Sequence, residues 1–366
     1  MYWPLFGVFT ALAAVGAGPV QAQDAQDSEA IKWRVNRDTV GIVSSGTSGP
    51  KIGIAADLAA VLDRSSSLRI IPMIGKGPVQ SITDIRYLRG TDIGIVQSDV
   101  LAYVRSSGLH DEVDQRISYI ARLFDEELHV LAGDGVTSLQ DLAGRKVGFG
   151  PAGGGTFVTA SIVFDALRIK VEPVALDDAH AIEKLRSGEI AASVHLAERP
   201  FGSLAGLTSG DGVQLLPVAL GPELQDIYEA SALTAEDYPG LIEPGSTIDT
   251  ISVAAVMAVS DWQPGTWRYE KVERFVDAFC GEFDELREGE HHKAWDEIDL
   301  SAELDGWKRF PRATELLGRS SPASDDAALA AFNRFLDENG GADLSEERKA
   351  DLYQRYLKWR KADGAS

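Results

Sequence analysis

Two glycine-rich segments carry hydroxyl groups at points where a strand is expected to end and a helix to begin. The apolar residues 40–43 precede the run SSGTSGP at 44–50, and residues 146–149 precede GPAGGGT at 150–156. Glycine lets the backbone approach a ligand closely, and a helix N-terminus offers unpaired N–H groups with a partial positive charge. This chemistry favours anion binding. Either segment alone is equally typical of an ordinary capped turn, but the same arrangement at two predicted strand ends favours a ligand site.

Further polar side chains follow other predicted strands and turns. Gln97 and Ser98 end one apolar run, where both can reach a ligand, although capping of the next helix is the alternative for Ser98. Lys76, in the turn GKGP, is either an anion partner or a solvated turn residue. Arg199, in the segment ERP, is a candidate for a bidentate carboxylate contact. The candidate ligand-binding residues are Ser45, Gly46, Thr47, Ser48, Lys76, Gln97, Ser98, Gly154, Gly155, Thr156 and Arg199.

Composition narrows the class of protein. The length of 366 residues suggests two domains at roughly 150 residues each, and 44% of the residues are hydrophobic. A net charge of −21 argues against binding to nucleic acid or to an anionic membrane, since both begin with Lys and Arg neutralising phosphates. A single cysteine, Cys280, excludes a disulfide framework and any multi-cysteine metal site. We therefore expect a binding protein, or an enzyme with little His or Cys chemistry, and no bound metal.

One segment matches a cofactor motif only formally. Gly148, Gly150 and Gly153 have the spacing of the dinucleotide fingerprint, and Glu172 stands where an acidic ribose partner would be expected. Pro151 interrupts that loop, and the motif lies in the second half of the strand–helix pattern. We therefore expect no nicotinamide cofactor.

The N-terminus indicates export. Residues 3–20 are apolar and small, and Val20-Gln21-Ala22 fits a cleavage site ahead of a polar stretch. This pattern predicts a signal peptide over residues 1–22, removed after about Ala22. No Lys or Arg precedes the apolar run, so an uncleaved membrane anchor is the alternative. The mature protein is expected in the periplasm.

Strand–helix alternation runs through the chain twice. Strands are predicted at 40–43, 68–74 and 93–97 with helices at 52–62, 79–88 and 99–104. The pattern restarts with strands at 146–149, 171–174 and 191–196 and helices at 157–167 and 179–185. Such alternation indicates an α/β fold with mostly parallel sheets. Two β-rich runs, 117–132 and 250–259, are expected to connect two lobes, with hinge rotation at about 124–128 and 250–256.

Other segments have less specific patterns. The acidic run at 125–127 is typical of a solvated turn, although it coincides with the first predicted connector. Beyond Trp262 the pattern becomes helical, at 269–287 and again through 295–317. A Ser/Pro/Asp linker at 320–326 precedes two predicted amphipathic helices, 327–338 and 345–361.

Several ordered blocks of the chain resemble a known family. The blocks VGIVSSGTSG at 40–49, GKGPVQ at 75–80, DIGIVQSD at 92–99 and SLQDLAGRKV at 138–147 are similar to those of TAXI-type TRAP transporter solute-binding proteins. The segments at 119–131, 188–192 and 237–239 continue the resemblance in order, over about residues 34–318. Two positions depart from the family: GGGT replaces a common GSGT at 153–156, and Arg199 replaces a common lysine.

The resemblance implies a type II periplasmic-binding-protein fold, with two α/β lobes joined by a two-strand hinge. Lobe 1 would comprise residues 31–124 and 257–318, lobe 2 residues 125–256, and a helical extension residues 319–366. The implied function is capture of a small organic anion (glutamate, a 2-oxo acid or a dicarboxylate) and delivery to TRAP membrane subunits by a monomeric protein without a cofactor.

An exported α/β hydrolase is the alternative from another class. It would use Ser48 or Ser98 as its nucleophile, but no histidine stands at a recognisable spacing from either serine. A binding protein would show saturable binding without turnover, whereas a hydrolase would consume its substrate.

Overall fold

The computed structural model describes residues 20–46, 49–109 and 112–317. The first lobe is built on three parallel strands in the order β2-β1-β3, namely β1 (Thr39–Ser44), β2 (Arg69–Ile74) and β3 (Ile93–Gln97). Helices α2 (Pro50–Ser65), α3 (Pro78–Tyr87) and α4 (Val100–Ser107) follow the three strands in turn. Each helix begins just after the carboxyl end of a strand, so the polar residues there lie at one edge of the sheet.

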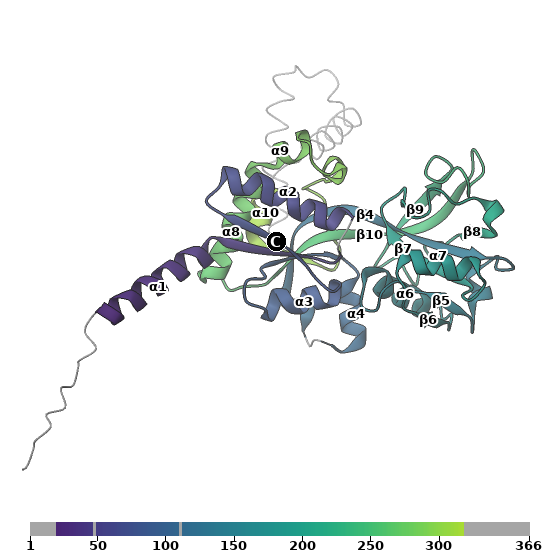
Figure 1. Cartoon of the computed structure of the whole chain (residues 1–366), viewed down its shortest axis with the longest axis horizontal. Coiled ribbons are helices and arrows are strands. Elements are labelled where there is room, and N and C mark those ends of the chain that lie inside the picture. Colours follow the sequence, from purple (N-terminus) through teal and green to yellow (C-terminus); the bar gives the residue numbers. More distant parts are fainter. Residues whose placement is uncertain (1–19, 47–48, 110–111, 318–366) are drawn as a thin grey trace, which may run out of the picture.

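Two long strands join this lobe to the second one. Strand β10 (Thr247–Ser260) pairs antiparallel with β3 and with β4 (Ile117–Gly133), and both strands continue into the second lobe (Figure 1). Their register shifts near Ala254 and Val256, which marks irregular pairing between the lobes. The two predicted connectors are therefore these two strands.

The second lobe repeats the strand–helix pattern on the far part of β4. Strand β7 (Ala192–Ala197) pairs antiparallel with β4, and β5 (Lys146–Gly148) and β6 (Glu172–Val174) continue the sheet in parallel. Helix α6 (Gly155–Ala166) follows β5, and α7 (Asp178–Arg186) packs on β7. Strands β8 (Val213–Leu216) and β9 (Glu229–Thr234) pair with β4 and β10.

Each lobe has its own hydrophobic core. In the first lobe Leu58 of α2 packs in one cluster with Phe275 of α8 (Trp267–Gly281). In the second lobe Phe164 of α6 belongs to a separate cluster with Leu142. Separate hydrophobic clusters in each lobe and two connecting strands confirm the expected α/β fold of the type II periplasmic-binding-protein class.

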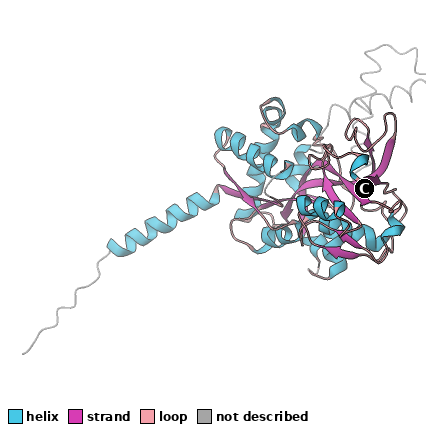
Figure 2. Ribbon diagram, turned by 45° about the vertical axis from the view of Figure 1, so that its right-hand side comes forward, coloured by secondary structure: helices cyan, strands magenta, loops and turns pink. Residues whose placement is uncertain are grey.

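The remaining described elements belong to both lobes, apart from the projecting first helix. They are α1 (Val20–Arg37), α5 (Val113–Arg116), α9 (Phe283–Glu288), α10 (Pro311–Leu317), β11 (Lys308–Arg309) and short 3-10 helices at Leu139–Leu142, Ser209–Asp211 and Lys293–Glu297. Helix α1 projects from the body of the first lobe (Figure 2). None of the helices in the described ranges combines the length and apolar character that crossing a membrane requires.

Three local expectations need correction. The acidic run at 125–127 is not a solvated turn but part of β4, with Glu126 and Glu127 both 5% exposed. The predicted helix 269–287 is two helices, α8 and α9, separated at Glu282. The region 295–317 is helical only at its two ends, in a 3-10 helix that ends at Glu297 and in Pro311–Leu317, whereas residues 298–307 are irregular.

The terminal predictions lie largely beyond the described residues. Residues 1–19 and the extension 319–366 fall outside them, and so do the helices predicted at 327–338 and 345–361. The cleavage position predicted after Ala22 lies within α1, which begins at Val20.

Candidate functional site

Polar groups without partners gather at the carboxyl ends of β1 and β3. Ser44 is completely buried at the end of β1, and its Oγ has no hydrogen-bond partner; the buried Oγ of Ser45 has none either. Gln97 ends β3, is 3% exposed, and leaves its Oε1 unsatisfied. Since β1 and β3 pair in parallel, these groups share one edge of the sheet. Buried polar atoms normally have partners, so this edge has unused capacity for hydrogen bonding.

The N-terminus of α6 lies against this edge from the other lobe. A Cβ added to Gly155 would overlap Nε2 of Gln97 and stand 2.7 Å from its Cδ. A Cβ added to Gly77 would overlap the carbonyl oxygen of Gly153. Gly77 also has a φ of 124°, which side chains rarely adopt. Gly77 therefore permits a backbone-to-backbone contact and Gly155 a close contact with the Gln97 side chain, and the two lobes are closed upon each other.

Asp99, the N-cap residue of α4, links the lobes through its carboxylate. Its Oδ2 accepts hydrogen bonds from Thr159 Oγ1 of α6 (2.6 Å) and from the hydroxyl of Tyr228 (3.1 Å). Its Oδ1 is buried without a partner. Burial raises the pKa of Asp99 to about 6, and the hydrogen bonds from Thr159 and Tyr228 oppose that rise. The carboxylate is therefore held between lobes in a site that does not fully satisfy its charge.

A buried ion pair crosses from the first lobe to the connecting strand. Lys51 Nζ, in the first turn of α2, donates to Glu126 Oε1 at 2.6 Å and to Oε2 at 2.5 Å. Both side chains are more than nine-tenths buried. A cation is unfavourable at a helix N-terminus, so Glu126 stabilises Lys51 there. Both groups also act electrostatically on Asp99, so three ionisable side chains interact where the lobes meet.

Arg199 contacts a carboxylate of its own lobe. Its Nε lies 3.2 Å from Glu127 Oε1, and its Nη1 donates to the carbonyl of Ala232. Burial raises the pKa of Glu127 to about 7, against the lowering effect of Arg199 and of a hydrogen bond from Ser231. The guanidinium of Arg199 is therefore bound to groups of the second lobe, and not to Ser44 or Gln97.

The other predicted site residues fall in several environments. Lys76 is exposed, whereas Ser45 and Gly46 are half-buried beside the cleft edge. Thr156 Oγ1 accepts a hydrogen bond from the Leu196 N–H at 3.2 Å, and Gly154 is the N-cap residue of α6. Thr47 and Ser48 lie outside the described residues. The structure thus brings Gln97 directly against Gly155 and leaves Lys76 and Arg199 at the periphery.

Ser98 does not cap the following helix. The N-cap of α4 is Asp99, while the backbone of Ser98 donates to Ala254 O (2.8 Å) and accepts from Trp307 Nε1 (3.0 Å). These bonds fix the backbone between β3 and β10. The alternative role considered for Ser98, as a helix cap, is therefore wrong.

A hydrogen-bonded Ser–His–Asp chain exists elsewhere in the second lobe. His195 Nδ1 lies 2.7 Å from Asp178 Oδ1, and its Nε2 lies 2.9 Å from Ser193 Oγ. Ser193 is completely buried on β7, so no substrate can reach its hydroxyl in this structure. The arrangement satisfies the buried His195 and gives no support to hydrolysis. Within the described part of the chain, no group of three or more His, Cys, Asp or Glu side chains could hold a metal ion.

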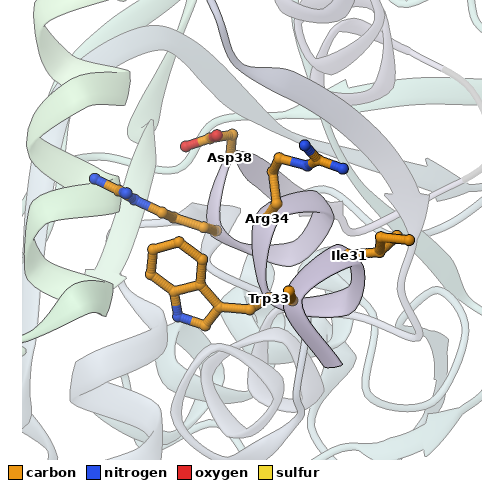
Figure 3. Close-up of a pocket in the computed structure, with 6 residues that line it drawn as sticks. Ile31, Trp33, Arg34 and Asp38 are labelled. Carbon is orange, nitrogen blue, oxygen red and sulfur yellow. The ribbon is translucent and has the colours of Figure 1, made fainter. Parts of the chain in front are cut away.

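A hollow at the base of α1 is lined by one stretch of chain only. Its lining residues are Ala30, Ile31, Trp33, Arg34, Arg37 and Asp38 (Figure 3). Trp33 is 59% exposed, and the guanidinium of Arg37 lies 4.9 Å from its ring. This hollow contains none of the residues that meet between the lobes, so we place the candidate site in the cleft.

Sequence reasoning missed the charged groups of the cleft. Lys51, Asp99, Glu126 and Tyr228 were not among the candidates, although Asp99 lies in a quoted block of the resemblance. The position of Lys51, directly after Pro50 in the first turn of a predicted helix, could have indicated a nearby acidic partner, because the start of a helix disfavours a cation. The Lys51–Glu126 contact itself joins residues that are 75 positions apart, and no local pattern reveals it.

Two α/β lobes, joined by two long strands and meeting through polar groups, define the two-lobed fold class of periplasmic solute-binding proteins. The chain belongs to the NMT1-like family, whose model matches residues 44–306.

Solved structures of similar fold include a TctC solute binding protein from Polaromonas. It is 14% identical, with a TM-score of 0.41, covering 71% of this chain and 86% of that one. A histidine-bound ABC uptake transporter substrate binding protein from Streptococcus pneumoniae is 12% identical, with a TM-score of 0.43, covering 72% and 93%. An arginine-bound amino acid transporter protein from the same species, AbpA, is 15% identical, with a TM-score of 0.39, covering 73% and 98%.

Proposed function

We propose that this protein is an extracytoplasmic solute-binding subunit that captures a small carboxylate-bearing solute between its lobes. The observation that carries the proposal is the set of unsatisfied, buried polar atoms at the strand ends: Ser44 Oγ, Ser45 Oγ and Gln97 Oε1. Of the three residues, Gln97 lies against Gly155 at the N-terminus of α6, where backbone N–H groups and the helix dipole favour an anion. A ligand carboxylate placed there would accept hydrogen bonds from the hydroxyls of Ser44 and Ser45, whereas Gln97 Oε1 would need a donor group of the ligand.

The strength of such a site is adequate for capture. A hydrogen bond to a charged group contributes roughly 1.5–3 kcal/mol, and micromolar affinity corresponds to about 8 kcal/mol. Four or five such bonds, from the hydroxyls of Ser44 and Ser45, the side-chain N–H of Gln97 and the first turn of α6, total about 6–15 kcal/mol before association costs, so micromolar affinity requires bonds near the upper end of that range. The net charge of −21 does not oppose this, because salt screens distant charges beyond a Debye length of about 8–10 Å.

The transport role and compartment are finer parts of the proposal. The resemblance to TAXI-type TRAP proteins supports delivery of the solute to TRAP membrane subunits, and the apolar N-terminus supports a periplasmic location. The proposed lobes are residues 31–124 with 257–318 and residues 125–256, with rotation at about 124–128 and 250–256. The protein is proposed to act without a cofactor and without catalysis.

A charge at Ser45 tests the proposed carboxylate site. Ser45→Asp places a like charge beside the ligand carboxylate, so calorimetry with a panel of amino and organic acids should show at least a 100-fold loss of affinity. Ser203→Asp is the matched control, because Ser203 is exposed in the second lobe and outside the cleft. Circular dichroism should show both variants folded. Equal affinity in Ser45→Asp and the wild type would place the pocket elsewhere.

A further inference from the structure

The carboxylate of Asp99 lacks a donor. A carboxylate offers about four acceptor sites on two oxygens. Thr159 and Tyr228 both donate to Oδ2, whereas Oδ1 has no partner and the residue is 1% exposed. An unsatisfied buried group retains most of its desolvation cost, and the cost is greater for a charged group. The closed lobes therefore leave Oδ1 of Asp99 as a buried acceptor without a donor.

The ionisable groups around Asp99 also lack one positive charge. Asp99 and Glu126 are buried carboxylates, and Lys51 is the cation that acts on both. Lys51 already donates to both oxygens of Glu126. The partners of Asp99 on the second lobe, Thr159 and Tyr228, are neutral donors. The three ionisable groups thus sum to −1 when Asp99 is ionised, and a cation would balance them.

We infer that the solute carries a protonated amine, which donates to Asp99 Oδ1 and balances this charge. The inference rests on the proposed function, in which the solute carboxylate meets Ser44, Ser45 and the start of α6. The solute class is then a zwitterion of the α-amino acid kind. A 2-oxo acid or a dicarboxylate without an amine presents only acceptors to Asp99 and repels it.

The two ends of such a solute would meet groups of opposite character. The carboxylate side offers the hydroxyls of Ser44 and Ser45 and the backbone N–H groups at the start of α6, whereas the amine side offers the unpartnered Oδ1 of Asp99. Gln97 and Asp99 are two residues apart at the end of β3, so both sides of the site are set by one strand end.

Matched pairs of ligands test the inference. Calorimetry would compare L-glutamate with 2-oxoglutarate and 2-hydroxyglutarate, L-leucine with 4-methyl-2-oxopentanoate, and L-alanine with pyruvate. We expect the amino acid of at least one pair to bind, and to bind at least tenfold more tightly than its oxo or hydroxy counterpart. Asp99→Asn should weaken that amino acid at least tenfold and leave or strengthen its counterpart. Asp165→Asn, an exposed position at the far end of α6, is the charge control.

The possible failures are distinguishable. If the oxo or hydroxy acid binds the wild type as tightly as the amino acid, the amine inference is overturned and solute binding stands. If Asp99→Asn weakens both members of a pair equally, Asp99 stabilises closure without recognising an amine, and the inference is again overturned. If no member of any pair binds, the proposed capture of a small carboxylate solute fails, and the inference fails with it.

Discussion

Replacing Gly155 with alanine should weaken solute binding without weakening the fold. Gly155 is the first residue of α6, and its Cα faces the side chain of Gln97 across the closed cleft. An added methyl group would overlap the Gln97 amide, which is 3% exposed and has little room to move. When the lobes are open, the methyl group meets solvent. The substitution therefore acts on closure and on the position of Gln97.

The magnitude follows from packing and helix propensity. Overpacking a close-packed contact costs about 1–3 kcal/mol, and each 1.4 kcal/mol is tenfold in affinity. The dissociation constant should therefore rise about 5- to 150-fold. Within the second lobe, alanine in place of a helical glycine gains up to about 1 kcal/mol. Affinity and stability should thus move in opposite directions.

Calorimetry and small-angle scattering measure the two consequences. Gly155→Ala should bind more weakly and show a larger radius of gyration than the wild type at equal ligand concentration, while urea unfolding shows equal or higher stability. Gly202→Ala is the control, since a Cβ there meets nothing within 4 Å. If Gly155→Ala binds as tightly and compacts as fully as the wild type, the closed contact between Gln97 and α6 is not part of the binding mechanism.

Two further predictions concern buried charge. Affinity for an amine-bearing solute should fall by up to tenfold per pH unit below about 6, because Asp99 has a pKa raised to about 6 and its protonation removes the charge that attracts the amine. The other ionisable groups facing Asp99 are Lys51, Glu126 and Tyr228. A pH-independent affinity between pH 7 and pH 5 would contradict this prediction. Lys51→Met should destabilise the protein by about 3–5 kcal/mol in urea unfolding, because it leaves Glu126 buried and unpaired. Adding Glu126→Gln should restore most of that loss, and equal stability of the single variant and the wild type would refute the argument.

The order of elements could be predicted because it depends on local patterns. In α2, the buried Ile54, Leu58 and Leu62 recur at helical spacing, and Pro50 at its start is a favoured first residue. The long strands β4 and β10 were recognisable as connectors because each apolar run exceeds the length of an ordinary strand. Periodicity did not reveal the irregular segment around Trp295 and Phe310, which is ordered by burial in the core.

The site was only partly predictable. Gln97 and Gly155 were candidates because glycine and polar residues at strand ends are a local signal, and the structure places them in contact. The pairing of Lys51 with Glu126 and the contacts of Asp99 with Thr159 and Tyr228 are non-local, since the partners are 75, 60 and 129 positions apart in the chain. The acidic run at 125–127 was misleading, because charged residues favour exposure unless a distant partner such as Lys51 compensates them.

Native mass spectrometry tests the central claim, that the closed cleft holds one small solute, most directly. The protein would be incubated with a mixture of amino acids and small organic acids, desalted and measured intact, followed by identification of the released molecule. The account predicts a mass excess of one small carboxylate-bearing molecule per chain in the wild type and in Ser203→Asp, and its loss in Ser45→Asp. No mass excess in the wild type, or an equal excess in Ser45→Asp, would contradict it.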